Sequence, residues 1–552
     1  MAAAENKKSS SNSILVQGSI LVVTSFVSRL IGLCYRFPLT RIVGKVGMDY
    51  YGTAYSIYSI LLVISTYSVP TAISKMISER EAVGETENAK RIFKGSLILM
   101  TSVGLFMSLL FYFGADFLAA SVQTPMAASA LRVLAPVLLV TSIVGVIRGF
   151  FQGFNTMVPT AVSQIIEQIA NAVVSVLAAY ELYHYGDEVE TLLNQPHMSS
   201  AYGAAGGTLG TVVGAIAALI FLLFLLVPFL KSRNRRKVRS NQRIESNQQI
   251  LYIMLATIFP MVLNAIVYNI TSVAEMYVFK NIAVVQKYSA TQISLWWMAY
   301  SQEFIVVQNL PVTVANSLAS PIVPSLAESY AQKDRKAIRS KINSTTRFIM
   351  AIVLPITVGM MVISGPIIQL LFGDGDITSA RIMTLGALSV PFYSLSSLSS
   401  SMLQGINKLR IPVKVSLITL FAHMGLLTFL LLVFRMNIFA VVIAYIFDGF
   451  LMAFLNNIAV RKYTKTRYQV GKTFLIPLFS SVVMGAAVFA AYHILFAVLG
   501  RNSIATLVSI LVGIIVYAAV ILKTGGITEN ELKRLPKGNS LCRLARRMHL
   551  FP

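Results

Sequence analysis

Two arginines within an apolar stretch are the residues whose chemistry is plainest from the sequence. Arg29 and Arg36 lie seven residues apart, with Gly32 between them. Seven residues turn an α-helix through roughly 700°, so both side chains share one face and lie about 10 Å apart along the axis. A guanidinium group keeps its charge and binds phosphate oxygens in pairs, so we expect a water-filled, anion-binding cavity that suits a diphosphate. The alternatives are that Arg36 reaches the membrane surface and that Arg29 pairs with an acid on another helix.

Four acidic residues also fall in apolar stretches, where a charged side chain is costly and usually faces a cavity or a partner. They are Glu167, Glu275, Glu303 and Asp448. Each could bind a hydroxyl group of a sugar or peptide, take up a coupling proton or cation, or form an ion pair with one of the two arginines.

Glutamines accompany two of these acids at helical spacing. Glu167 belongs to a stripe that also contains Gln164, Gln168 and Asn171, and Glu303 lies near Gln302 and Gln308. A polar stripe forms either a helix–helix contact or a cavity wall, and four members on one helix favour the wall. The predicted substrate-binding residues are Arg29, Arg36, Gln164, Glu167 and Glu303. The candidate ion-coupling residues are Glu275 and Asp448.

The sequence contains few residues in patterns typical of metal binding or catalysis. The five histidines show no metal-ligand spacing, so we predict no metal site. Gly471-Lys472-Thr473 resembles the end of a phosphate-binding loop, but Thr466 stands where that loop needs glycine. We therefore expect no enzymatic activity and no cofactor, with Na⁺ or H⁺ as a candidate coupling ion. Cys34 and Cys542 are predicted to lie far apart and to form no disulfide.

Composition identifies the elements that must position these residues. Of 552 residues, 56% are hydrophobic and 12% are charged, about half the usual charged share of a soluble domain. A spanning helix needs about 20 mostly apolar residues. That rule predicts an all-α polytopic membrane protein with about fourteen spans. They are 14–38, 50–74, 92–114, 128–150, 159–181, 203–230, 250–279, 291–320, 345–371, 380–403, 412–434, 438–460, 473–498 and 502–522.

The net charge of +24 is explained by the membrane and needs no nucleic acid. With the N-terminus in the cytoplasm, most of the 46 Lys and Arg residues fall in inside segments, as the positive-inside rule requires. The predicted outside loops hold only Arg41, Lys45, Lys280, Lys287, Arg381, Arg435 and Arg501. The acidic residues Asp187, Glu188 and Glu190 are also expected outside, after the fifth span. Both termini are therefore predicted to be cytoplasmic.

An internal duplication organises the spans. Gln152–Pro159 and Gln404–Pro412 both read Gln-Gly-x-Asn followed by proline, 252 residues apart. Because six spans is an even number, two six-helix repeats insert in parallel, and substrate is expected at their interface. The expected organisation is an N-terminus (1–13), an N-lobe (14–230), a basic linker (231–249), a C-lobe (250–460), two extra spans (461–524) and a basic tail (525–552). Part of the tail could form a helix on the inner leaflet or remain disordered.

Several motifs resemble those of MurJ-type lipid II flippases, within the multidrug/oligosaccharidyl-lipid/polysaccharide (MOP) exporter superfamily. They are Ser28-Arg29-x-x-Gly32-x-x-x-Arg36, Val69–Lys75, Pro324–Glu328, Arg148–Gly153 and Ser163–Gln168. The last two look closest to the SpoVB/YtgP branch. The resemblance covers nearly the whole chain. It implies translocation of an undecaprenyl-diphosphate-linked peptidoglycan precursor, lipid II, to the outer leaflet of the bacterial cytoplasmic membrane by alternating access.

The resemblance also bears on individual residues and partners. In that family, arginines on the first helix line the central cavity, and Arg29 and Arg36 match them. Gram-negative members add arginines on helices 2 and 8, where this chain has no arginine and Glu303 respectively. Some relatives bind sodium in the C-terminal lobe. The expected partners are the lipid-linked glycan and membrane lipids, with no nucleic acid, and the protein is expected to be a monomer.

Three other functions are compatible with parts of this sequence. A flippase for a teichoic, capsular or exopolysaccharide precursor would use the same diphosphate chemistry. An ion-coupled multidrug exporter of the same superfamily would bind cationic drugs, for which two arginines on the first helix are unsuited. A membrane glycosyltransferase would need acidic groups beside a sizeable loop at the membrane face, and the loops here are short.

Overall fold

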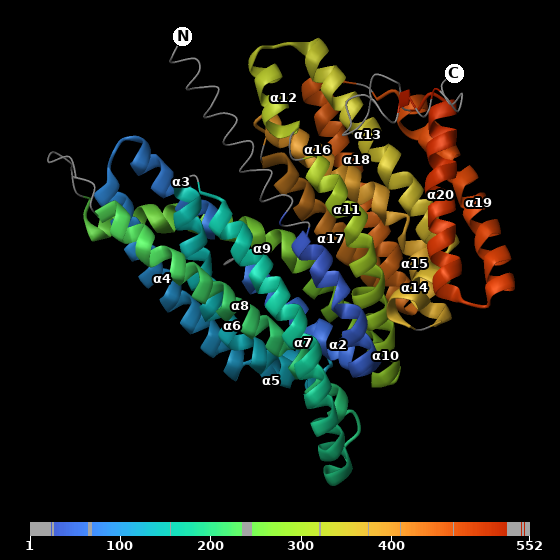
Figure 1. Cartoon of the computed structure of the whole chain (residues 1–552), viewed down its shortest axis with the longest axis horizontal. Coiled ribbons are helices and arrows are strands. Elements are labelled where there is room, and N and C mark those ends of the chain that lie inside the picture. Colours follow the sequence, from blue (N-terminus) through green and yellow to red (C-terminus); the bar gives the residue numbers. More distant parts are fainter. Residues whose placement is uncertain are drawn as a thin grey trace. The chain divides into compact units, whose positions relative to one another are not determined.

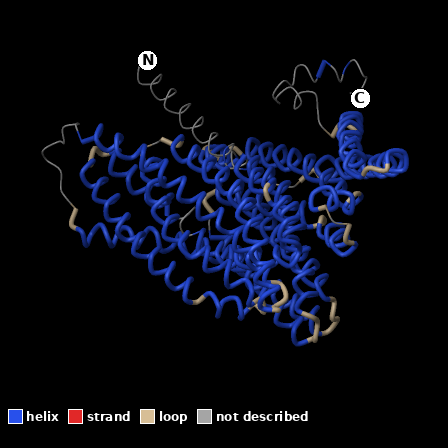
Figure 2. The backbone as a smooth tube through the Cα atoms, turned by 60° about the horizontal axis from the view of Figure 1, so that its bottom comes forward, coloured by secondary structure: helices blue, strands red, loops and turns tan. Residues whose placement is uncertain are grey.

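The computed structural model describes residues 24, 27–63, 69–154, 156–234, 245–319, 322–373, 375–408, 410–466, 468–526, 542, 543 and 546. Over these ranges the regular structure is entirely helical (Figure 2). The chain divides into two compact units, Met1–Met298 and Ala299–Pro552. The predicted surface helix of the tail lies almost wholly outside the described residues.

Ten helical segments in the described part of the chain are long and apolar enough to cross a membrane. They are Thr86–Phe113, Pro125–Gly153, Val158–Leu193, Met198–Ser232, Arg335–Val362, Ile377–Gly405, Arg410–Leu432, Asn437–Thr464, Gly471–Leu499 and Asn502–Lys523. Each overlaps one predicted span, which confirms an all-α polytopic membrane protein. The predicted span 345–371 differs most, because α13 (Arg335–Val362) ends at Val362 and a separate helix follows it. The count of fourteen stays a prediction.

The first unit is built around α6, which packs against α3, α4 and α8 (Figure 1). Its helices are α2 (Arg36–Val63), α3 (Val69–Ala82), α4 (Thr86–Phe113), α5 (Ala115–Ser121), η2 (Pro125–Ala127), α6 (Ala128–Gly153), α7 (Val158–Leu193), α8 (Met198–Asn234), α9 (Asn247–Val285) and α10 (Ala290–Met298). Gly44, at φ 70°, breaks α2 in a backbone conformation that side chains resist. The expected outside loop at Arg41 and Lys45 is therefore helix on both sides of a single kinked residue.

The second unit repeats this plan around α16, which packs against α12, α13 and α18. Its helices are η3 (Ala299–Phe304), α11 (Ile305–Ala319), α12 (Ile322–Ala331), α13 (Arg335–Val362), α14 (Ser364–Phe372), α15 (Ile377–Gly386), α16 (Ser389–Gly405), α17 (Arg410–Leu432), α18 (Asn437–Thr464), η4 (Gly471–Leu475), α19 (Ile476–Leu499) and α20 (Asn502–Lys523). The last pair, α19 and α20, packs on α13 and α14.

The duplication is visible in the packing order and in single contacts. The pairs α3–α6, α4–α6, α6–α8 and α7–α8 correspond to α12–α16, α13–α16, α16–α18 and α17–α18. The glycines of the two Gln-Gly pairs occupy equivalent places. A Cβ on Gly153 would lie 2.8 Å from Ile77 Cβ, and one on Gly405 would lie 3.2 Å from Leu326 Cβ. Both copies therefore need glycine for the same close helix crossing.

The boundary between the compact units falls later than the predicted linker at 231–249. Helix α9 packs against α2, α3 and α4, so its contacts belong to the first unit although the sequence repeat begins a second copy there. Ser246 starts α9 with a capping box, accepting a hydrogen bond from the Gln249 N–H. The lobe limits drawn from the repeat stay a prediction.

A long helical hairpin extends from the first unit. Helices α7 and α8 contain 36 and 37 residues, or about 54 Å each at 1.5 Å per residue, against a hydrocarbon core of about 30 Å. At its tip, Glu190 accepts hydrogen bonds from the backbone N–H groups of His197 and Ser199, both at 3.0 Å. Figure 1 shows this tip beyond the other labelled helices of its unit. The acidic residues expected in an outside loop thus lie in the last turns of α7.

Candidate functional site

The predicted arginine face lies in the first unit. Arg29 is exposed, in a helical segment that covers residues 27–34, and Arg36 is half-buried at the start of α2. A turn at Tyr35 separates the two segments. A Cβ placed on Gly32 would lie 3.5 Å from Gln168 Oε1 of α7. The arginine-bearing segment is therefore next to the polar stripe that the sequence places on the fifth span.

Tyrosines surround Arg36. Its guanidinium carbon lies 6.0 Å from the ring centroid of Tyr55, within the range of a cation–π attraction. Tyr55 stacks on Tyr51 at 5.7 Å between centroids, and the Tyr51 hydroxyl is 2.8 Å from that of Tyr35. The cluster holds a permanent cation beside phenolic hydroxyl groups, which can donate hydrogen bonds to an anion.

Glu167 forms an ion pair with an arginine of the neighbouring helix α6. Its Oε2 lies 2.7 Å from Nη2 of Arg148 in α6, and Arg148 Nε donates to Ser163 Oγ at 2.9 Å. The sequence offers pairing with Arg29 or Arg36 as one of three alternatives for this acid, and the structure pairs it with Arg148 instead. Arg148 is 5% exposed, so the Glu167 carboxylate compensates a buried positive charge. The available signal was a basic residue inside the span 128–150 followed by an acid in the next span.

The rest of the polar stripe has two different roles. Gln164 Oε1 is buried and accepts no hydrogen bond from any described residue, which is costly unless a ligand or water supplies a donor. Asn171 instead faces α8, where a Cβ on Gly210 would lie 2.5 Å from the Asn171 carbonyl oxygen. The two interpretations of the stripe therefore both apply. Its Asn171 end is a helix–helix contact, and its Gln164 end resembles a polar cavity wall.

Two of the predicted acids lie in the core of the second unit. Glu303 is fully buried in the π-helical turn η3, a form that often occurs at functional sites. Asp448 in α18 is 3% exposed, and its Oδ2 accepts a hydrogen bond from the Tyr393 hydroxyl at 2.8 Å. The other oxygen, Oδ1, is buried and accepts no hydrogen bond among the described residues.

Aromatic rings connect these two acids. Tyr445 lies 4.5 Å from Tyr393 and 6.2 Å from Phe304, between ring centroids, and its hydroxyl donates to Gln308 Oε1 at 3.3 Å. We call Glu303, Gln308, Tyr393, Tyr445 and Asp448 the acidic core. Within the described residues, no group of three or more His, Cys, Asp or Glu side chains could hold a metal ion. The oxygen atoms of the acidic core could contribute to a site for a proton or an alkali cation.

A second buried charge cluster in the first unit corrects one prediction. Lys280, expected in an outside loop, lies in α9 with no exposed surface, because that helix continues to Val285. Its Nζ donates to both carboxylate oxygens of Asp49 and to the hydroxyls of Thr53 and Thr124. The hydroxyl of Ser294 in α10 also donates to Asp49, at 2.7 Å. Glu275, five residues earlier in α9, is 4% exposed.

Comparison with solved structures shows which fold the chain adopts. The chain resembles lipid II flippase MurJ in an inward closed conformation, with a TM-score of 0.66 and 18% identity, over 90% of this chain and 97% of the other. It also resembles an outward-facing multidrug resistance MATE family transporter of the MOP superfamily, with a TM-score of 0.56 and 14% identity, over 82% and 95%. The chain therefore shares the all-helical fold of these two proteins.

The family follows from the sequence comparisons. The family model described as "Lipid II flippase MurJ" matches residues 80–515, and the chain belongs to this family. Lipid II flippase MurJ of Bacillus subtilis (strain 168) is 24% identical over 436 residues, covering 74% of this chain and 75% of that protein. Stage V sporulation protein B of the same organism is 22% identical over 423 residues, covering 74% and 76%. The protein is thus a transporter from a family of lipid-linked precursor flippases.

Proposed function

We propose that this protein moves lipid II, an undecaprenyl-diphosphate-linked peptidoglycan precursor, from the inner to the outer leaflet of the bacterial cytoplasmic membrane by alternating access. The observation that carries the proposal is the set of donors in the first unit. The Arg36 guanidinium group and the Tyr51 hydroxyl come from α2, and the Tyr35 hydroxyl comes from the turn before it. Helix α7 adds the buried oxygen of Gln164, which accepts no hydrogen bond from the described residues. Such a set suits a ligand with an anionic diphosphate and a hydroxyl-rich sugar.

Each predicted residue has a part in this proposal. Arg29 and Arg36 bind the diphosphate, with two charge-assisted hydrogen bonds available from each guanidinium. Gln164 accepts a hydrogen bond from a sugar or peptide group. Glu167 holds Arg148 in place through its ion pair and presents its second oxygen to the substrate. Glu303 is proposed as a further substrate-contacting residue, and Glu275 and Asp448 are proposed as ion-coupling residues.

The membrane potential supplies a direction for transport. With the inside negative, outward movement of an anion is favoured by about 2.3 kcal/mol per charge per 100 mV. A proton or Na⁺ bound at the acidic core on the return step would neutralise buried carboxylates and make the empty carrier easier to reset. In this scheme both termini are cytoplasmic and the transporter acts as a monomer with membrane lipids around it.

Reconstitution with a matched control tests the proposal. Purified protein in liposomes is supplied with fluorescent lipid II in one leaflet, and its appearance in the other leaflet is measured. We expect Arg36→Ala to abolish translocation and Arg41→Ala to preserve it, because Arg41 is an exposed residue on the same helix and has no predicted role.

Other substrates provide the decisive comparison. If a teichoic-acid precursor is translocated and lipid II is not, the protein is still a flippase for lipid-linked precursors, but its substrate is different from the one proposed. Efflux of a cationic drug without lipid translocation would overturn the proposal, as would normal lipid II transport by the Arg36→Ala variant.

A further inference from the structure

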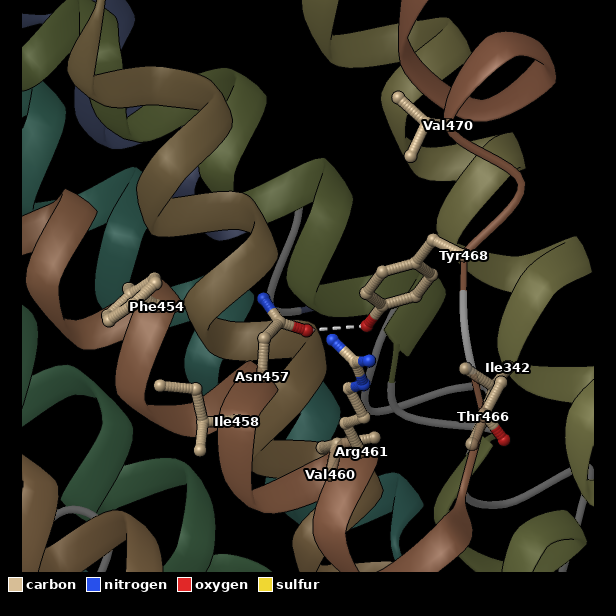
Figure 3. A pocket seen from close by; sticks show the side chains of 9 residues that line it. All are labelled: Ile342, Phe454, Asn457, Ile458, Val460, Arg461, Thr466, Tyr468 and Val470. Atoms are coloured by element: carbon tan, nitrogen blue, oxygen red, sulfur yellow. Dashed lines mark hydrogen bonds between the residues drawn. The ribbon is translucent and has the colours of Figure 1, made fainter.

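A pocket in the second unit lies where α18 ends. It has a cavity volume of about 370 Å³, which is within the range of small-ligand sites. Its lining includes Phe454, Asn457, Ile458, Arg461, Tyr468 and Val470. Figure 3 shows the Arg461 side chain directed toward the Asn457 amide and the Tyr468 hydroxyl, which are hydrogen-bonded to each other.

One wall of this pocket is apolar and faces outward. Phe454, Ile458 and Val470 are 51%, 50% and 57% exposed. Helix α18 is one of the membrane-spanning candidates. Large apolar side chains on the outside of a spanning helix face lipid tails, so the pocket opens toward hydrocarbon as well as toward the helix end.

The polar end of the pocket carries uncompensated positive charge. Arg461 is exposed and forms no ion pair with any described residue. The lining contains no acidic residue. Lys462 and Lys465 follow in the chain and are also exposed. A lone guanidinium beside an apolar wall is complementary to an anion that carries alkyl chains.

We propose that this pocket binds an anionic glycerophospholipid of the phosphatidylglycerol class. Arg461 donates two hydrogen bonds to the lipid phosphate, and the acyl chains lie along Phe454 and Ile458. The hydrogen bond from the Tyr468 hydroxyl to Asn457 holds the Tyr468 ring beside the headgroup. The site is separate from the proposed translocation pathway and does not depend on the flippase activity.

Native mass spectrometry of the full-length protein in detergent tests the site. Phosphatidylglycerol and phosphatidylcholine with identical acyl chains are titrated separately, and bound lipid is counted. We expect Arg461→Gln to weaken phosphatidylglycerol binding about fivefold, the effect of one cation near an anionic lipid. Arg410→Gln is the matched control, since Arg410 is exposed at the start of α17 and does not line the pocket.

Three further measurements complete the test. Phe454→Ala should weaken phosphatidylglycerol binding as well, because the acyl chains lose a wall. Arg461→Lys keeps the positive charge but loses the paired N–H donors of the guanidinium group, so it should bind phosphatidylglycerol with intermediate affinity. This variant replaces Arg461→Gln in the test if Arg461→Gln does not fold. Equal losses in Arg461→Gln and Arg410→Gln would show diffuse attraction and overturn the site. Equal binding of phosphatidylcholine, or displacement of the lipid by a polyprenyl diphosphate, would overturn it too.

Discussion

Lys280 Nζ lies 2.8 Å and 3.0 Å from the two carboxylate oxygens of Asp49, and neither residue has exposed surface. The pair joins α9 to α2 inside the first unit. Each charge is satisfied by the other and by neighbouring hydroxyl groups, so removal of either one leaves a buried ion without compensation.

This pair predicts a non-additive pattern of stability. Lys280→Met and Asp49→Asn should each destabilise the protein by about 3–5 kcal/mol, whereas the double variant should recover much of the loss. Thermal unfolding midpoints in detergent measure the effect. Additive losses in the double variant would show that the two residues act independently.

The Arg148–Glu167 pair predicts an order of effects. The Arg148 side chain is 6% exposed and that of Glu167 is 22% exposed. Glu167→Gln leaves the more deeply buried charge, that of Arg148, without a partner. It should therefore destabilise the protein by about 1–3 kcal/mol, which is more than the loss expected for Arg148→Gln. Glu181→Gln, on the exposed surface of α7, is the control and should leave the unfolding midpoint unchanged. The reverse order would mean that water reaches Arg148.

The equivalent glycines predict equal sensitivity in the two repeats. Gly153→Ala and Gly405→Ala should each destabilise by about 1–3 kcal/mol, since the added methyl group meets the neighbouring helix. Gly359→Ala in α13 meets no atom within 4 Å and should stabilise by up to about 1 kcal/mol through better helix propensity. Unfolding in detergent compares all three, and a destabilised Gly359→Ala variant would contradict the packing described.

Asp448 predicts a separation of ion dependence from substrate binding. Asp448→Asn removes the charge that a coupling cation or proton would neutralise but keeps an acceptor for Tyr393. We expect lipid II binding to persist while transport loses its dependence on Na⁺ or pH. Tyr393→Phe should alter that dependence without abolishing it. Unchanged ion dependence in Asp448→Asn would remove this residue from the coupling step.

The sequence predicts the helices better than it predicts which side chains pair with one another. Apolar length located the ten spanning segments, and two Gln-Gly pairs revealed a duplication that the contacts of Gly153 and Gly405 confirm. The partner of Glu167 could not be predicted, because pairing depends on which helices touch. Hydropathy treats every charged residue as exposed and therefore predicts a loop at Lys280. In the structure the carboxylate of Asp49 compensates the charge of Lys280, so this residue lies in a buried helix. Hydropathy also predicts that the helix ends before Asp187. In the structure α7 continues through these polar residues, beyond its apolar part.

The projecting end of the α7–α8 hairpin offers a practical handle for imaging. A transporter of this size has little mass outside the detergent belt by which particles can be aligned in electron micrographs. The hairpin tip is ordered by the three hydrogen bonds of Glu190 and extends away from the spanning core. An antibody fragment raised against this rigid tip would report the orientation of the first unit while leaving the arginine-bearing helix untouched.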